Sequence, residues 1–289
     1  MWQSIAQQLS EHLQHPLSNL VHTPLSGEDD DRKHRLTDGT EEWFIKIRPR
    51  PALEQFQAEF RALQRLNHLQ PGLSPEPVMT GHCADEAFLV LPYLTLTDGQ
   101  PDDWYHLGMA LACLHRCVDQ AMYGWAEDTW VGTTLQPNRW HKQWHRFFAE
   151  QRIGWQLTLL REKRLLDDHF HIKDIVELVS RQLQDHQPEP SPLHGDLWRG
   201  NVGFCNKQGI LFDPASYCGD REIDLAMTEL FERFPAGFYA GYEHIWPLDR
   251  GYAGRRDLYN LYHRLNHFNQ FGEPFREQAV SALQRLMAG

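Results

Sequence analysis

The first ninety residues alternate between strand-like and helix-like spacing of hydrophobic positions. The chain opens with a helical pattern up to about residue 15, and the polar stretch LSGEDDDRKHRLTDGTEE then predicts a strand, a turn and a second strand. In EEWFIKIRP, Trp43, Ile45 and Ile47 stand at every second position. A strand over this segment would therefore place Lys46 on the face opposite its larger hydrophobic set.

A helix and a buried strand complete this first part of the chain. Between residues 53 and 69, hydrophobic residues recur at the intervals of an amphipathic helix, and Glu59 lies on the flank of the hydrophobic stripe. After the proline-rich break PGLSPEP, the run AFLVLPYL predicts a buried strand that ends at Pro92. These patterns predict an N-terminal lobe over residues 1–92.

The rest of the chain, residues 93–289, is predicted to form a second lobe that is mostly helical. In its middle, NVGFCNKQGILFDPA predicts a hairpin with Gly209 in its turn. Helical spacing of hydrophobic residues predicts helices over residues 104–118, 139–160, 172–183, 220–234 and 258–271.

Composition favours a globular protein that stays in the cytoplasm. The 289 residues are 41% hydrophobic and 23% charged, and the N-terminus lacks the pattern of a signal peptide. No hydrophobic run approaches the ~20 residues that span a bilayer. Five cysteines without a Cys-x-x-Cys spacing indicate reduced thiols. The formal net charge of -11 disfavours nucleic acid and anionic membranes as partners, because both carry negative charge.

The segment SPLHGDLWRGNVGF and the strand after it carry the residues with the clearest chemistry. Asp196 and Asn201 are five residues apart, and Asp213 follows twelve residues later at the end of GILFD. Phosphoryl transfer from ATP needs a carboxylate beside the attacking hydroxyl and oxygen ligands that hold Mg²⁺ on the phosphates. This triplet predicts Asp196 as the catalytic base, with Asn201 and Asp213 as Mg²⁺ ligands. The alternative is that these residues only build turns.

Lys46 and Glu59 are candidates for the site that anchors the ATP phosphates. In kinases, a strand lysine that contacts the α- and β-phosphates is held by a carboxylate of the next helix, and this pair has that order. The alternative is that Lys46 is a solvated surface charge. The 17 histidines show none of the spacings typical of zinc sites, so no metal site is predicted from them.

The order of these motifs resembles the small-molecule kinases of the protein-kinase-like superfamily, which include the aminoglycoside and choline kinases. More narrowly, three segments are similar to the fructosamine (ketosamine) kinase family: HGDLWRGN with its tryptophan, FDPASYCGDREIDLAM, and the late LYHRLNHFNQFG. The similarity extends from about Trp43 to Phe271. It implies a two-lobed α/β kinase fold, with a small β-rich N-terminal lobe and a larger, mostly helical C-terminal lobe.

The resemblance also implies an activity and roles for further residues. The activity is phosphorylation of a ketosamine by ATP and Mg²⁺ at the 3-hydroxyl, on a small molecule or a glycated protein lysine, in the repair or metabolism of glycated amines. Adenine would be held by the carbonyl of Pro92 and the N–H of Leu94, and Asp224 would brace the catalytic loop. The ring of Trp198 would stack on the acceptor, and packing inside the lobe is the alternative.

One segment departs from the family pattern. The hairpin that covers the nucleotide is generally glycine-rich, whereas Gly27 is followed here by acidic residues up to Asp31. Glycine allows close approach to a phosphate, and carboxylates repel it unless they face solvent or bind metal. Two other functions therefore stay open: a kinase of another small alcohol, such as an aminoglycoside or choline, and a non-catalytic binding module of the pseudokinase kind.

Overall fold

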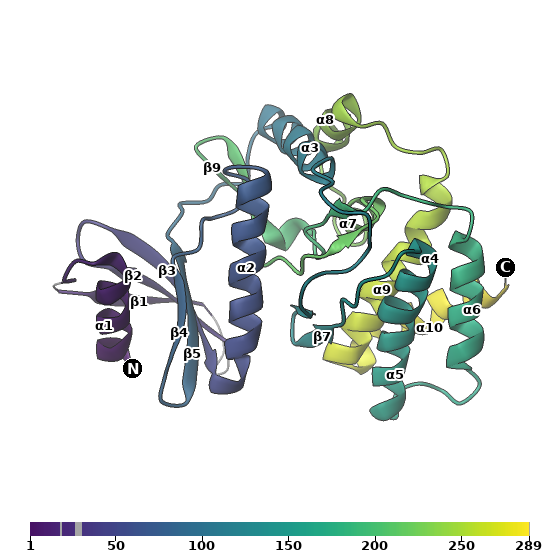
Figure 1. The fold of residues 1–289 in the computed structure, drawn as a ribbon, viewed down its shortest axis with the longest axis horizontal. Helices are drawn as coiled ribbons and strands as arrows, with labels where there is room; N and C mark the ends of the chain where they lie inside the picture. The colour runs from purple at the N-terminus through teal and green to yellow at the C-terminus, as the bar shows by residue number, and fades with distance from the viewer. Residues whose placement is uncertain (18, 27–30, 289) are drawn as a thin grey trace. The chain divides into compact units, whose positions relative to one another are not determined.

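The chain forms two compact units in the computed structural model, which describes residues 1–17, 19–26 and 31–288 (Figure 1). Unit 1 consists of Met1–Gly99 together with Gly203–Phe212, and unit 2 consists of Gln100–Val202 together with Asp213–Gly289. A short part of unit 1 is therefore inserted between the two segments of unit 2. Among the residues described, none of the helices has the length and hydrophobicity needed to span a bilayer.

Unit 1 is built on an antiparallel sheet of five strands in the order β1-β2-β3-β5-β4. The strands are β1 (Val21–Ser26), β2 (Arg32–Thr37), β3 (Glu42–Pro49), β4 (Met79–Cys83) and β5 (Glu86–Pro92). β3 is the central strand, and its Lys46 pairs with Lys33 of β2 and with Leu89 of β5. This register fixes the face to which the Lys46 side chain points, because successive side chains of a strand alternate between faces.

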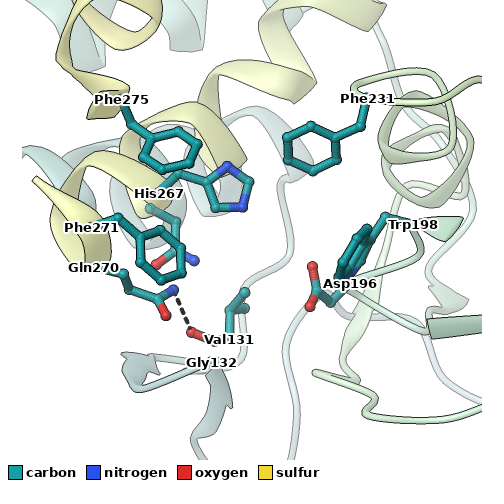
Figure 2. A pocket seen from close by; sticks show the side chains of 10 residues that line it. Val131, Gly132, Asp196, Trp198, Phe231, His267, Gln270, Phe271 and Phe275 are labelled. Carbon is teal, nitrogen blue, oxygen red and sulfur yellow. Dashed lines mark hydrogen bonds between the residues drawn. The ribbon is translucent and has the colours of Figure 1, made fainter. Parts of the chain in front are cut away.

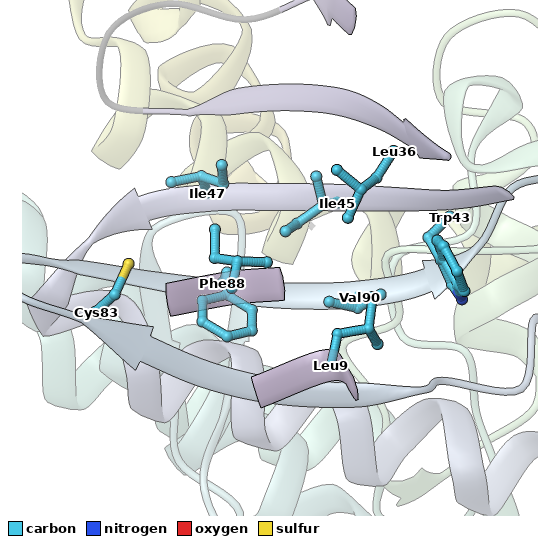
Figure 3. Close-up of a cluster of buried hydrophobic side chains, with 9 residues drawn as sticks. Leu9, Leu36, Trp43, Ile45, Ile47, Cys83, Phe88 and Val90 are labelled. Carbon is cyan, nitrogen blue, oxygen red and sulfur yellow. The ribbon is translucent and has the colours of Figure 1, made fainter. Parts of the chain in front are cut away.

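Two helices cover the two faces of this sheet. Hydrophobic residues at even positions of β5 pack on the side of α1 (Trp2–Leu13), and those at odd positions pack on the side of α2 (Leu53–Leu69). Figure 3 shows the first of these clusters, with buried side chains from α1 and the strands β2 to β5. Ile45 and Ile47 of β3 belong to it, so Lys46 between them faces α2. The helix predicted over residues 53–69 is confirmed.

The inserted part of unit 1 contains a hairpin of β9 (Val202–Cys205), whose first residue still belongs to unit 2, and β10 (Gln208–Leu211). Asn206 and Lys207 form its turn, with left-handed φ angles of 51° and 68°. The predicted turn residue, Gly209, lies in β10 instead. A two-residue hairpin turn needs positive φ at both positions, and asparagine adopts that conformation more readily than most residues, so the turn forms without the glycine.

Unit 2 is mostly helical (Figure 1). Its helices are α3 (Pro101–His115), α4 (Trp144–Phe147), α5 (Trp155–Glu162), α6 (Ile172–Leu183), α7 (Glu222–Met227), α8 (Ala236–Ile245), α9 (Tyr252–Phe271) and α10 (Glu273–Ala288). The described part of unit 2 also contains two short strand pairs, β6 (Thr129–Val131) with β7 (Thr134–Gln136), and β8 (Ser191–Pro192) with β11 (Cys218–Gly219).

Two of the predicted helices are interrupted. The helix predicted over residues 139–160 is α4 and α5, separated by the π-helical turn Phe148–Gly154, whose wider spacing leaves the hydrophobic pattern nearly unchanged. The helix predicted over residues 220–234 ends at Met227. There the Thr228 hydroxyl donates to the Leu225 carbonyl, a local bond that competes with helix formation.

Candidate active site

Asp196 and Asn201 are joined by hydrogen bonds in the loop between β8 and β9. Asn201 is buried and ends the 3₁₀ turn Arg199–Asn201. Its Nδ2 donates to the Asp196 carbonyl at 2.9 Å and to the Asp196 Oδ2 at 3.3 Å. Both bonds use the amide nitrogen, so the amide oxygen of Asn201 is left for another partner. The loop therefore offers a carboxylate and an amide oxygen side by side.

Asp224 of α7 holds this loop in place. Its carboxylate accepts hydrogen bonds from the backbone N–H of His194 at 2.7 Å, from that of Gly195 at 2.8 Å, and from the ring of His115 at 3.0 Å. Burial alone would raise the pKa of Asp224, but the hydrogen bond from His115 and the other donors outweigh it and lower the pKa. Gly195 has a φ of 86°, and a Cβ there would lie 2.1 Å from the Ala215 carbonyl oxygen, so the loop requires glycine.

Asp213 follows β10 at the point where the chain re-enters unit 2. Its φ of 58° is left-handed, which costs energy for a residue other than glycine and is found preferentially at functional sites. Burial, and then the negative charge of Asp213, raise the pKa of Asp196 to about 7. The two carboxylates are therefore close enough to repel each other, and a cation bound beside them would relieve that repulsion.

Lys46 and Glu59 form an ion pair inside unit 1, between β3 and α2. The Lys46 Nζ lies 2.6 Å from the Glu59 Oε1, and Lys46 is only 3% exposed. The alternative of a solvated surface lysine is therefore wrong. A buried ammonium group needs a carboxylate partner, because its desolvation without one is costly. The ion pair fixes the position of an otherwise flexible cation.

Pro92 and Leu94 lie where β5 ends. Pro92 is the last residue of the strand and pairs with Trp43, and Leu94 follows it, half-buried, in an irregular connector. Between them, the Tyr93 N–H donates to the Glu42 carbonyl at 3.1 Å and anchors the connector to β3. The contact of Pro92 and Leu94 with adenine stays a prediction.

The acidic segment from Gly27 to Asp31 lies mostly outside the described residues, which omit 27–30. Asp31 is described, and its Oδ1 accepts a hydrogen bond from the Arg48 Nε at 2.8 Å. Lys33 lies 3.6 Å from its Oδ2. Burial raises the pKa of Asp31, but Arg48 and the lysines lower it by more, so the net shift is downward. Basic side chains of unit 1 thus neutralise this last acidic residue.

A pocket in unit 2 opens beside Asp196 (Figure 2). Its volume of about 310 Å³ is in the range of sites for small molecules. The other residues that line it are Val131, Gly132, Trp198, Phe231, Asn266, His267, Gln270, Phe271 and Phe275. Half of the lining residues have aromatic rings, His267 included, and Asp196 is the one carboxylate among these described lining residues.

Trp198 contributes an accessible ring to this wall. It is 39% exposed, and its ring meets that of Phe231 edge to face, with 5.9 Å between the centroids. Figure 2 shows both rings on the same side of the pocket as Asp196, with Phe271 and Phe275 on the other side. A ring that lines a pocket and is partly exposed is available for stacking on a ligand. The role of Trp198 in acceptor binding stays a prediction.

Sequence reasoning assigned no role to the remaining aromatic residues of the pocket. His267 and Phe271 stand four residues apart in α9, and this spacing is the signal that could have placed them on one face of that helix. Phe275 follows in α10, beyond the end of α9 at Phe271. Burial lowers the pKa of His267 to about 4, so its ring is neutral at physiological pH. The described lining residues therefore include no positive charge.

Known proteins resemble this chain over its whole length. A model of the fructosamine kinase family matches residues 1–289. The chain is 46% identical over 289 residues to a probable ketoamine kinase of Vibrio vulnificus, covering 100% of both chains. A solved structure of a putative fructosamine-3-kinase from Haemophilus somnus gives a TM-score of 0.93 at 32% identity, covering 99% of this chain and 98% of that one.

The fold is shared more widely. The aminoglycoside phosphotransferase APH(4)-Ia gives a TM-score of 0.66 at 14% identity, covering 100% of this chain and 98% of its own. At that identity the likeness concerns the fold alone. The predicted kinase-like fold, with a sheet-containing N-terminal part and a helical C-terminal part, is confirmed.

Proposed function

The chain belongs to the fructosamine kinase family, and we propose that it transfers the γ-phosphoryl group of ATP to the 3-hydroxyl of a ketosamine. The family supports the coarser statement, an ATP-dependent kinase with a ketosamine acceptor. The position of the hydroxyl, the metal and the roles of individual residues are our proposal. The observation that carries it is the carboxylate of Asp196 on the wall of an aromatic pocket with room for a sugar.

Asp196 is the proposed catalytic base. With a pKa of about 7, its carboxylate is ionised in a large fraction of molecules at neutral pH and can take the proton of the acceptor hydroxyl as the new O–P bond forms. The bond between the γ-phosphorus and the oxygen of ADP breaks in the same step. Because Asn201 occupies the Oδ2 of Asp196, Oδ1 is the oxygen that would face the acceptor.

Asn201 and Asp213 are the proposed ligands of Mg²⁺. The residues fit this ion by their donor chemistry, since hard cations bind carboxylate and amide oxygens. The Asn201 amide is bonded to Asp196 through nitrogen and keeps its oxygen, and the charge of Asp213 raises the pKa of its neighbour. When bound, Mg²⁺ would neutralise charge on the phosphates of ATP.

Unit 1 supplies the proposed nucleotide contacts. Lys46, positioned by Glu59, would bind the α- and β-phosphates of ATP. Because the ion pair already restricts the lysine side chain, less conformational entropy is lost on binding. The carbonyl of Pro92 and the N–H of Leu94, at the end of β5, would bind adenine.

The aromatic wall is proposed to hold the amine part of the acceptor. The amine of a ketosamine is a cation at neutral pH, and a cation is attracted to the faces of rings such as Trp198. Neutral His267 does not repel it. A phosphate on C3 is a better leaving group than hydroxide, so the product should eliminate inorganic phosphate, and hydrolysis of the resulting unsaturated adduct by water should then release the amine. This would make the reaction a repair step for glycated amines, on small molecules or on protein lysines.

A panel of acceptors tests the proposed function. The purified protein is mixed with ATP, Mg²⁺ and, in turn, several ketosamines, choline and aminoglycosides, and ADP release is measured. Phosphorus NMR of the product then locates the phosphate, which is expected on O3 of the ketosamine. Turnover of choline or an aminoglycoside alone would replace the proposal with a kinase of another small alcohol. No turnover and no ATP binding would favour a non-catalytic module.

Trp198→Ala is expected to raise the KM for the ketosamine by about tenfold, because an aromatic contact worth roughly 1–2 kcal/mol is lost, while the KM for ATP changes little. Trp140→Ala is the matched control, since Trp140 is 41% exposed and is not among the residues that line the pocket. Both KM values and the thermal midpoint are measured for each variant. A lowered midpoint with an unchanged ketosamine KM would assign Trp198 to packing.

A further inference from the structure

Asn266 buries a hydrogen-bond donor that has no partner among the described residues. It lies on α9, lines the same pocket as Asp196 and is 0% exposed. Its Nδ2 is shielded from solvent and makes no hydrogen bond to any residue that the structure describes. An unpartnered buried donor destabilises a folded protein unless a ligand supplies the missing acceptor, and Asn266 combines such a donor with a place on the pocket wall.

A relay of three amides determines which end of Asn266 is the donor. The Asn269 Nδ2 donates to the backbone carbonyl of Gln156 at 2.9 Å and to the Gln156 Oε1 at 2.7 Å. A backbone carbonyl only accepts, so Asn269 must present its nitrogen and Gln156 its oxygen. The Gln156 Nε2 then donates to the Asn266 Oδ1 at 3.2 Å. The remaining group of Asn266 is therefore NH₂.

Two histidines of α9 lie on either side of this donor in the sequence, and both are neutral. His263 precedes Asn266 by one turn of α9, is 1% exposed, and has its Nδ1 3.8 Å from the Asp196 Oδ1. Burial lowers the pKa of His263 to about 3 and that of His267 to about 4, so both rings are uncharged. Residues three apart on a helix are neighbours, with about 5–6 Å between their Cβ atoms. Asn266 is thus close to the carboxylate that would take the proton.

We propose that Asn266 determines acceptor specificity by donating from Nδ2 to the oxygen on C2 of the ketosamine, and this inference rests on the proposed function. C2 adjoins the carbon whose hydroxyl is phosphorylated, so an acceptor with that hydroxyl on Asp196 keeps its C2 oxygen close to Asp196, in the pocket that Asn266 also lines. In the open-chain form this oxygen is a ketone, which accepts hydrogen bonds and cannot donate them. It therefore matches an NH₂ group. An acceptor without it would leave the donor unpaired.

The test compares a ketosamine with its analogue that has CH₂ in place of the C2 carbonyl. In the wild type, kcat/KM for the ketosamine should exceed that for the analogue by about tenfold or more. Asn266→Leu, which is close in volume, and Asn266→Asp, which keeps an oxygen for Gln156, should each bring this ratio close to unity. The KM for ATP should not change. A variant that is merely less stable should lower kcat/KM for both acceptors by the same factor and leave the ratio unchanged.

Asn260→Leu is the matched control. Asn260 is another asparagine of α9, is 2% exposed, has an unpartnered Oδ1 and is not among the pocket residues. Its replacement should leave the ratio unchanged. A ratio that survives in both Asn266 variants, or that falls equally in Asn260→Leu, overturns the inference. If the wild type phosphorylates the ketosamine and the analogue equally well, the inference about Asn266 is wrong and the proposed function stands. If the wild type phosphorylates no ketosamine, the proposed function is wrong and the inference falls with it.

Discussion

Asp196→Asn is expected to lower kcat by about 100-fold or more, while the protein still folds and binds ATP. The amide has the shape of the carboxylate but cannot accept the proton of the acceptor hydroxyl. The wild-type carboxylate is 18% exposed on the pocket, and its Oδ2 accepts a hydrogen bond from Asn201. Initial rates at saturating ketosamine measure the first effect, and a nucleotide titration measures the second. Near-normal turnover would remove Asp196 from the role of base.

Asp196→Asn should also make the protein more stable at high pH, although it lowers kcat. Folding raises the pKa of Asp196 from 3.8 to about 7, so the folded state disfavours the ionised form. The resulting destabilisation is absent below pH 3.8, grows as the pH rises, and is complete above about pH 7. In metal-free protein, the thermal midpoint of Asp196→Asn at pH 8 should therefore exceed that of the wild type, and this difference should vanish near pH 4.

Asp168→Asn is the control for both measurements. Asp168 also belongs to unit 2, but its side chain is fully exposed and it is not among the pocket residues. Its replacement should alter neither kcat nor the pH dependence of the midpoint. A midpoint of Asp196→Asn that falls below that of the wild type at pH 8 would contradict the repulsion between Asp196 and Asp213.

Asp213→Asn is expected to raise the Mg²⁺ concentration for half-maximal activity by about tenfold or more and to lower kcat. Replacing even the partners of metal ligands weakens binding by about 10–100-fold, and here a charged ligand itself is lost. Asn201→Ala should have the same effect more mildly, because an uncharged oxygen is removed. Activity is titrated with Mg²⁺ at fixed ATP, with Asp168→Asn alongside. Unchanged titrations for both variants would contradict the assignment of these residues as ligands.

The helices whose bounds could be predicted from the sequence are those that bury only one face. The helices over residues 53–69 and 172–183 begin and end where the hydrophobic spacing predicts, because each sets one hydrophobic face against the protein. The end of α7 could not be predicted in this way. All of its residues, Glu222–Met227, are buried, so no polar face marks its end, and the pattern ran on to residue 234.

Contacts between the candidate site residues were predictable where those residues are close in the sequence. Asp196 and Asn201 share one loop, and the ion pair of Lys46 and Glu59 joins a strand to the next helix. The pocket wall was not predictable, because Val131, Trp198, Phe231 and the α9 and α10 residues come from separate segments. The free donor of Asn266 depends on a relay that begins at Gln156, which no local pattern reveals.

The hairpin of residues 203–212 also constrains how the protein is made. Leu211 donates its N–H to the Leu73 carbonyl at 2.8 Å, and Thr97 and Phe204 exchange backbone hydrogen bonds, so unit 1 is incomplete without this hairpin. During synthesis, residues 1–99 of unit 1 leave the ribosome before the hairpin does. Roughly a hundred further residues must be added first, which takes on the order of 5–20 s at usual rates. During that interval the five strands β1 to β5 are already available, but Leu73 and Thr97 lack their hydrogen bonds to the hairpin, and chaperones would meet unit 1 in this incomplete form. A truncated chain that ends at Gly99 would never receive the hairpin, so its unit 1 would stay incomplete.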